Sequence, residues 1–338
     1  MTFHARGLLS LLYHGKKALD LVAAASELGV VGRLDQGPAT LHELCEETRA
    51  VPNRLYKLMD GLESLGLVVR TQPEDNILSA RYHAPEPLGP AIQAVLGPHS
   101  LEQDRDGYPW QETFGRLPEI LRNEHSPKGF SWPPSTEDQV ADFERSMAAG
   151  APPIVEALTL LSSDVFGKRV GRATRWLDVG GGDGVVAEAL LEKLDHLHAD
   201  VFNLPAVFPL VQARAARLSH DRLGFVGGDF LAGPLPNGYD VISFVRVLHD
   251  WPANVARTLV EKAYEALPSG GSIVVCEEFR SAERLAIQFF WTYFLVGVDS
   301  CVSRLRERTW YEDALTKAGF RNVECRPGAF EVVVAQKP

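Results

Sequence analysis

A run of glycines follows an apolar segment in the C-terminal half of this 338-residue chain. Residues 176–184 read WLDVGGGDG, and residues 185–194 behind them have the pattern of a helix. A strand that enters a glycine turn and then a helix presents free backbone N–H groups and a positive dipole end, and glycines let a ligand approach closely. The segment therefore predicts a nucleotide-binding site.

The spacing of the glycines narrows the choice of nucleotide. Glycines at 180, 181, 182 and 184 do not fit G-x-G-x-x-G, because residue 185 is Val, and the Gly-Lys-Ser/Thr of a phosphate-binding loop is absent. Asp178 and Asp183 favour a ligand that carries an ammonium and a sulfonium group. We therefore expect S-adenosylmethionine, while a glycine turn that merely packs a helix on a strand remains the alternative.

The second group of residues is His249-Asp250-Trp251, directly after another apolar run. A methyl acceptor such as a phenol has a pKa near 10 and is mostly protonated at neutral pH, so a base must remove its proton. Histidine titrates near pH 6.5, and it can be neutral before the transfer and charged afterwards. His249 is therefore the candidate general base.

Strands that alternate with helices are expected to position these groups. Apolar strands are predicted at 176–179, 199–202, 225–226, 241–245 and 272–276, and helices at 185–194, 210–218, 252–267 and 310–318. This alternation predicts an α/β fold with a doubly wound, mostly parallel sheet and a ligand at the carboxyl ends of the strands. Two last strands, 323–325 and 330–335, predict a closing antiparallel hairpin.

Residues 1–85 have a different pattern. Thr40 and Glu43 have the spacing of a capping box that opens a helix, a third helix follows from Pro52, and residues 67–69 begin a short strand. We expect a mainly helical winged-helix-like domain here. Residues 86–165 are then a helical linker and substrate-pocket region, and residues 166–338 a cofactor-binding catalytic domain.

Composition limits the partners and the location. The net charge is −10, and residues 1–81 hold 9 Lys/Arg against 10 Asp/Glu, which disfavours nucleic acid. Apolar helices such as 8–21 instead favour dimerisation. The four cysteines form no C-x-x-C pair, no signal peptide is evident, and the apolar run 289–298 is too short to span a bilayer. We expect a cytoplasmic protein without membrane contact.

Several separated motifs together resemble the S-adenosylmethionine-dependent small-molecule O-methyltransferases of the caffeate, acetylserotonin and hydroxyneurosporene type. They are residues 177–182, 228–230 and 247–251, with Glu277 and residues 307–309. The resemblance covers nearly the whole chain. It implies a Rossmann-like methyltransferase sheet, S-adenosylmethionine as cofactor, and a homodimer formed through the N-terminal domain.

The resemblance also implies roles for individual residues. His249 matches the catalytic base, and Glu277 and Glu307 match the carboxylates that orient its imidazole. The expected cofactor-binding residues are Asp178, Gly180, Gly182, Asn203, Leu204, Asp229, Phe230 and Arg246. The expected acceptor pocket contains Phe143 and Met147, which share a helix face, with Asp250, Phe290, Phe294 and Val298.

Two positions depart from the family pattern. Asn203 stands where the family carries an acid for the ribose diol, which predicts weaker cofactor binding. Residues 302–306 replace the family's paired glycines, and Arg304 and Arg306 could face an acidic substrate or solvent.

The function predicted is methylation of a hydroxyl on an aromatic or polyketide-like small molecule. Methylation of carbon or nitrogen, another reaction on the same fold, and a non-catalytic metabolite-binding regulator are the alternatives. We expect no metal, although His196 with His198, or His249 with Asp250 and Glu277, could offer ligands to one.

Overall fold

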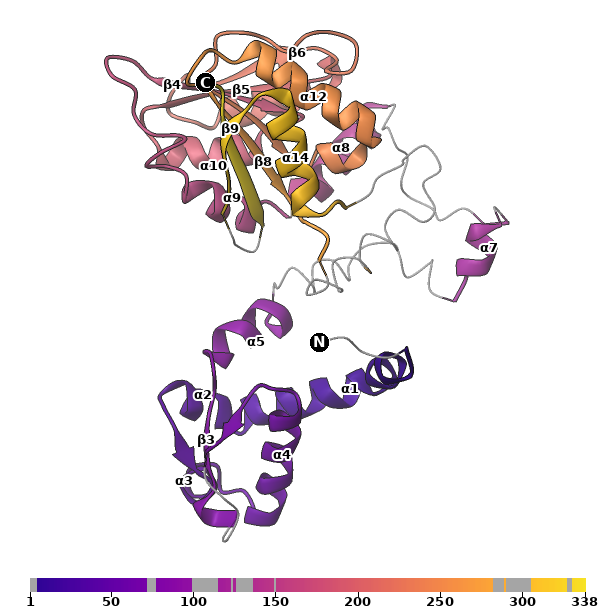
Figure 1. Cartoon of the computed structure of the whole chain (residues 1–338), viewed down its shortest axis with the longest axis vertical. Helices are drawn as coiled ribbons and strands as arrows, with labels where there is room; N and C mark the ends of the chain where they lie inside the picture. Colours follow the sequence, from indigo (N-terminus) through magenta and orange to yellow (C-terminus); the bar gives the residue numbers. More distant parts are fainter. Residues whose placement is uncertain are drawn as a thin grey trace. The chain divides into compact units, whose positions relative to one another are not determined.

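The chain folds into two compact units, residues Met1–Gly107 and Tyr108–Pro338, in the computed structural model (Figure 1). The structure describes residues 5–71, 77–98, 115–122, 124–125, 136–148, 150–281, 289, 305–326 and 330–338. The region 86–165, expected to be a helical linker and substrate-pocket region, contributes helices to both units. Helix α5 (Leu88–Leu96) belongs to the first unit, and α7 (Leu117–Leu121), α8 (Glu137–Ala148) and α9 (Ala151–Thr159) belong to the second.

The first unit combines helices with a small antiparallel sheet. Its other helices are α1 (Ala5–Glu27), α2 (Val30–Asp35), α3 (Leu41–Thr48) and α4 (Pro52–Ser64). The sheet has the order β1-β3-β2, from strands Ala39–Thr40, Arg81–His83 and Val69–Arg70. The predicted capping box is confirmed: the Thr40 hydroxyl accepts from the Glu43 N–H, and the Glu43 carboxylate accepts from the Thr40 N–H.

The second unit is built on a seven-stranded sheet of order β6-β5-β4-β7-β8-β10-β9. The strands are β4 (Thr174–Val179), β5 (Leu197–Asn203), β6 (Leu223–Gly227), β7 (Val241–Val245), β8 (Ser272–Glu277), β9 (Arg321–Arg326) and β10 (Glu331–Gln336). Strands β4 to β8 pair in parallel, whereas β10 runs antiparallel to both β8 and β9. The predicted mostly parallel sheet and its antiparallel hairpin are therefore confirmed.

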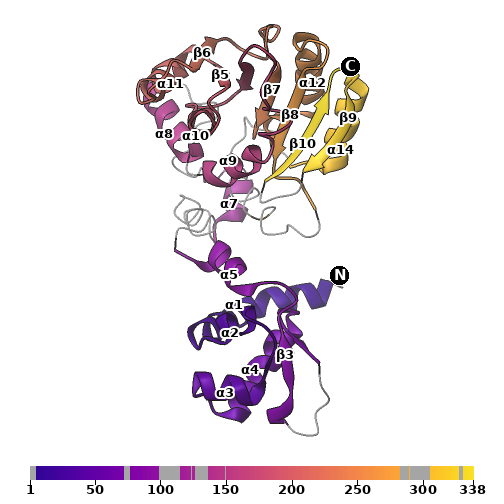
Figure 2. The ribbon, with the colours of Figure 1, turned by 90° about the vertical axis from the view of Figure 1, so that its left-hand side faces the viewer.

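Helices cover both faces of this sheet (Figure 2). Successive strand residues point to opposite faces, so Trp176 packs with α9, α10 (Val185–Lys193) and α11 (Phe208–Ala215), whereas Leu177 packs with α12 (Ala253–Ala266) and α14 (Arg308–Ala318). Strands covered on both faces are apolar almost throughout, which is why β7 and β8 read as continuous hydrophobic runs. The result is the doubly wound arrangement.

The strand order reverses between β4 and β7, which are neighbours in the sheet although two strands separate them in the chain. Ligands of doubly wound sheets bind outside the carboxyl ends of the strands at this reversal point. The glycine turn follows β4 and the His249 segment follows β7, so the topology brings the two motifs to the same edge. Within the described residues, no helix has both the length and the apolar character needed to cross a bilayer.

Candidate active site

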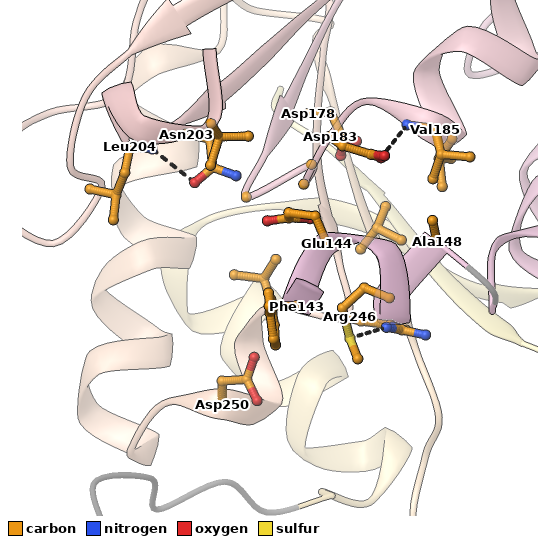
Figure 3. A pocket seen from close by; sticks show the side chains of 18 of the residues that line it. Phe143, Glu144, Ala148, Asp178, Asp183, Val185, Asn203, Leu204, Arg246 and Asp250 are labelled. Atoms are coloured by element: carbon orange, nitrogen blue, oxygen red, sulfur yellow. Dashed lines mark hydrogen bonds between the residues drawn. The ribbon is translucent and has the colours of Figure 1, made fainter. Parts of the chain in front are cut away.

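A cavity of about 400 Å³ lies at this edge of the sheet (Figure 3). Its volume is in the range of pockets for ligands of nucleoside size. All eight residues expected to bind the cofactor line it: Asp178, Gly180, Gly182, Asn203, Leu204, Asp229, Phe230 and Arg246. His249 and three of the expected acceptor residues, Phe143, Met147 and Asp250, line it as well. Topology has therefore brought both predicted groups to one cavity.

The glycine turn has a backbone that only glycine adopts easily. Gly180 and Gly182 have φ values of +72° and +56°, in the left-handed region. A Cβ atom at Gly180 would lie 2.8 Å from Val247 Cγ2, and one at Gly182 would lie 2.4 Å from Glu144 Oε2. The turn therefore leaves room for a ligand where side chains would fill the cavity.

Asp178 is the penultimate residue of β4, just before this turn. Its Oδ1 accepts a hydrogen bond of 2.6 Å from the Ser243 hydroxyl, which in turn accepts from the Trp176 indole N–H at 2.8 Å. Its Oδ2 is buried and has no hydrogen-bond partner. Burial raises the pKa of Asp178 to about 7. An unpartnered carboxylate oxygen in a buried setting suits a cationic donor, so this residue fits the ammonium group of S-adenosylmethionine.

Asp183 has a different role from the one expected. Its carboxylate pairs with the Arg214 guanidinium and accepts from the Val185 N–H at 3.1 Å. Arg214 also binds Glu188 at 2.5 Å. The negative charge of Asp183 is thus neutralised within the protein, and this residue holds α10 to α11 instead of attracting a cationic ligand.

The loops after β5 and β6 are each fixed by a carbonyl or carboxylate oxygen. Asn203 Oδ1 accepts from the Leu204 N–H at 2.8 Å, so the side-chain NH₂ group of Asn203 points away from that N–H (Figure 3). Asp229 Oδ1 accepts from the Leu231 N–H at 2.8 Å. The ring of Phe230 packs edge-on against Trp251, with centroids 5.8 Å apart. These loops can hold a ribose and a flat purine, as the family resemblance implies.

Arg246 directly follows β7 and has a left-handed backbone conformation, with φ +55°. Its N–H donates to the Cys276 carbonyl at 2.9 Å, which ties the residue to the neighbouring strand. Its guanidinium lies 2.6 Å from Met147 Sδ on α8. Arg246 therefore places a positive charge at the cavity wall, where the carboxylate of an amino-acid ligand could bind.

His249 is held by Glu277 from the end of β8. The imidazole Nδ1 is hydrogen-bonded to Glu277 Oε2, and both side chains are buried. Glu277 Oε1 also accepts from the backbone N–H groups of Val247, Leu248 and His249 at 3.2, 2.9 and 3.4 Å. One carboxylate thus fixes both the ring and the backbone segment that carries it.

Asp250 lies on the other side of the same ring. Its Oδ1 is 3.3 Å from His249 Nε2. Burial by itself lowers the pKa of His249, but the charges of Glu277 and Asp250 and their hydrogen bonds raise it to about 10. The imidazole therefore keeps its proton to higher pH than an ordinary histidine, which differs from the expectation of titration near 6.5.

Glu307 is not brought to the imidazole, contrary to the role that the resemblance implies. It precedes α14 as its N-cap residue, its side chain is 52% exposed, and it pairs with Arg280 at 3.9 Å. The position beside Nε2 is held by Asp250 instead. The acceptor residues Phe290, Phe294 and Val298 lie outside the described residues.

Arg306 is a buried structural residue, so the suggestion that it faces a substrate is not supported. Its guanidinium donates to the Leu248 carbonyl at 2.7 Å and to the Trp251 carbonyl, and it stacks over the Trp310 ring at 4.5 Å. These carbonyls flank His249 and Asp250. A tertiary contact between segments far apart in sequence could not be recognised from the arginine alone.

Sequence reasoning also missed Glu144 on α8, which lines the cavity beside Gly182. Its side chain is buried although it carries a carboxylate. A signal was present: Val140 and Met147 share its helix face at spacings of four and three residues, so Glu144 is an acid between apolar side chains.

Metal ligation finds no support in the part of the chain that the structure describes, because no group of three or more His, Cys, Asp and Glu side chains there could hold an ion. One member of the His196 and His198 pair has another role. The His196 Nε2–H donates to the Phe166 carbonyl at 2.7 Å and so packs the helix-strand connection.

Comparisons with known proteins agree with this geometry. The family model of the O-methyltransferase domain matches residues 101–321. An N,N-dimethyltransferase, OxyT, of Streptomyces rimosus is 30% identical over 94% of this chain and 91% of its own length. A demethylspheroidene O-methyltransferase of Cereibacter sphaeroides is 29% identical over 93% and 84%.

The crystal structure of the S-adenosylmethionine-dependent methyltransferase SibL has the same fold, with a TM-score of 0.61, 23% identity, and coverage of 98% of this chain and 99% of that one. The glycine turn, the unpartnered Asp178 oxygen and the family model point to one cofactor. The chain belongs to the O-methyltransferase family and is an S-adenosylmethionine-dependent methyltransferase.

Proposed function

We propose that this enzyme methylates a hydroxyl group, phenolic in class, on an aromatic or polyketide-like small molecule, with His249 as the general base. The observation that carries the proposal is the buried His249–Glu277 pair, in which His249 lines the cofactor cavity. Apolar side chains of Phe143, Ile154 and Trp251 line the same cavity, and such walls suit a flat acceptor.

The residues divide the chemistry between them. Bound S-adenosylmethionine supplies an electrophilic methyl group. Glu277 accepts a hydrogen bond from the Nδ1–H of His249, so Nε2, beside Asp250, is the nitrogen that removes the acceptor proton. The carboxylate then stabilises the imidazolium that this transfer creates. Because a phenol also has a pKa near 10, a base with a pKa of about 10 exchanges the proton with little free-energy change.

A screen of hydroxylated aromatic compounds with labelled cofactor, followed by assignment of the new methyl group, tests the proposal. We expect methyl transfer to oxygen, and we expect His249→Gln to lower kcat by about 10² to 10⁴ while S-adenosylhomocysteine still binds. A carbon-methylated product formed by His249→Gln at the wild-type rate would overturn it.

Nitrogen is the second candidate acceptor, because the relative OxyT of Streptomyces rimosus is an N,N-dimethyltransferase. A protonated amine also needs a base before it can attack, so the His249–Glu277 pair would serve both reactions. The same screen with aromatic amines separates the two. Exclusive methylation of amines would favour this second function.

We also propose that the N-terminal unit forms a homodimer. Helix α1 buries only Val22 and Ala25 within the described unit, while Leu9 is 66% and Tyr13 is 84% exposed. A helix that leaves large apolar side chains exposed is typical of an interface, and a second copy presents the same face. Light scattering is expected to give about twice 37.2 kDa, and a monomer over a wide concentration range would contradict the proposal.

A further inference from the structure

Glu144 is a carboxylate in a place where apolar side chains are expected. It projects from α8 into the cavity beside the glycine turn, near Asp183 (Figure 3). The side chain is only 7% exposed, and neither the family resemblance nor the His249 site uses it. Because burying a carboxylate is costly unless it is compensated, this residue calls for a partner.

The protein compensates this carboxylate only in part. The backbone N–H of Asp183 donates to it, and the charges of Arg246 and Arg214 favour its ionised form. Arg214 is already bound by Asp183 and Glu188, and the Arg246 guanidinium contacts Met147. Burial and the charge of Asp183 outweigh these effects and raise the pKa of Glu144 to about 7.

We propose that Glu144 is a cofactor-binding residue whose carboxylate accepts hydrogen bonds from the α-ammonium group of S-adenosylmethionine. The position of Gly182 is the first support, since the atom 2.4 Å from an ideal Cβ there is Glu144 Oε2, so the carboxylate lies at the turn that receives the methionine end. The buried, unpartnered Oδ2 of Asp178 at the same turn is the second.

Arg246 completes a charge pattern for an amino acid. A free α-amino acid carries an ammonium and a carboxylate, and the cavity wall offers a carboxylate on α8 and a guanidinium after β7. In the described part of the chain, Arg246 contacts Met147 and Glu144 accepts from the Asp183 N–H, and no ion pair joins the two side chains. Each is therefore available to one end of a zwitterion, and this inference rests on the cofactor site described above.

Binding measurements with two related ligands test the role. S-adenosylhomocysteine carries the ammonium group, whereas 5′-methylthioadenosine has the same nucleoside and sulfur without the amino-acid end. We expect E144Q to bind S-adenosylhomocysteine about 10- to 100-fold more weakly in calorimetry, because a charged hydrogen bond is lost, and to bind 5′-methylthioadenosine as the wild type does. D142N, an exposed acid on the same helix, is the matched control and should change neither affinity.

Three results would overturn the proposal. The first is an unchanged affinity of E144Q for S-adenosylhomocysteine, and the second is an equal loss of affinity for S-adenosylhomocysteine and 5′-methylthioadenosine. The third is a loss of affinity for S-adenosylmethionine much larger than that for S-adenosylhomocysteine, because this result would assign the carboxylate to the sulfonium. If E144Q does not fold, a crystal structure of the wild type with S-adenosylhomocysteine decides. We expect the Glu144 carboxylate within 3.2 Å of the ligand's amino nitrogen, about the limit of a hydrogen bond, and a carboxylate turned away would overturn the proposal. Wild-type protein that binds neither ligand would instead refute the cofactor site itself.

Discussion

Glu277 binds His249 twice, through the imidazole Nδ1 and through the backbone N–H of the same residue. It also accepts from the two preceding backbone N–H groups, so a single buried carboxylate positions the whole segment between β7 and α12. The orientation of the base is therefore fixed before any ligand binds. This arrangement leads to predictions that separate the residues around the ring.

Glu277→Gln is expected to lower kcat by about 10² to 10⁴, because an amide can donate to Nδ1 and leave the proton on Nε2, the tautomer that cannot act as base. S-adenosylhomocysteine affinity should stay within about twofold, since Glu277 is not among the cavity-lining residues. Glu307→Gln is the matched control, and an exposed acid whose ion-pair partner among the described residues is Arg280 should change kcat less than about twofold. Equal losses in both variants would restore a catalytic role for Glu307.

The pH dependence of kcat/KM reports the raised pKa of His249. Since the neutral ring is the base, kcat/KM should rise about tenfold per pH unit below the pKa of about 10. Asp250→Asn removes one of the negative charges that raise this pKa, so the rising limb should move to lower pH, towards 6.5. Asp313→Asn, which changes an acid remote from the ring, serves as control. An unchanged pH profile of kcat/KM in Asp250→Asn would show that a group other than His249 determines the rising limb.

Asn203→Asp is expected to bind S-adenosylhomocysteine about fivefold more tightly, because a carboxylate makes charge-assisted hydrogen bonds to ribose hydroxyls while still accepting from the Leu204 N–H. Calorimetry measures the change directly. Asn254→Asp, at the exposed start of α12, controls for added negative charge. Equal or weaker binding by Asn203→Asp would mean that the ribose does not lie at this residue.

Arg306→Met should reduce kcat by about tenfold or more and lower the thermal midpoint, because two carbonyls beside His249 and Asp250 lose their donor. Arg306→Lys should recover only part of kcat and only part of the thermal midpoint, since an ammonium lacks the planar guanidinium geometry that reaches two acceptors. S-adenosylhomocysteine affinity distinguishes local misplacement from general unfolding and should remain near the wild-type value.

Arg308→Met is the control for Arg306, because Arg308 is exposed and pairs with Glu312 on its own helix. A variant of Arg306 with normal kcat but a lowered thermal midpoint would assign this residue to stability alone.

The sequence by itself determined the elements and their order, because these depend on local chemistry. Thr40 and Glu43 cap a helix with groups three residues apart, and strand and helix periodicities predicted the sheet with its final hairpin. The parallel topology then required the glycine turn and His249 to share an edge. These inferences need no contact between distant side chains.

Only the tertiary structure decided which charges meet. It paired Asp183 with Arg214, placed Asp250 beside His249 in place of Glu307, and brought Glu144 from α8 to the glycine turn. Arg306 became a buried support because its guanidinium donates to backbone carbonyls of the segment after β7. Side-chain charge is visible in a sequence, but its partner and its burial depend on how separate elements pack, and these two factors set the pKa and the role of each group.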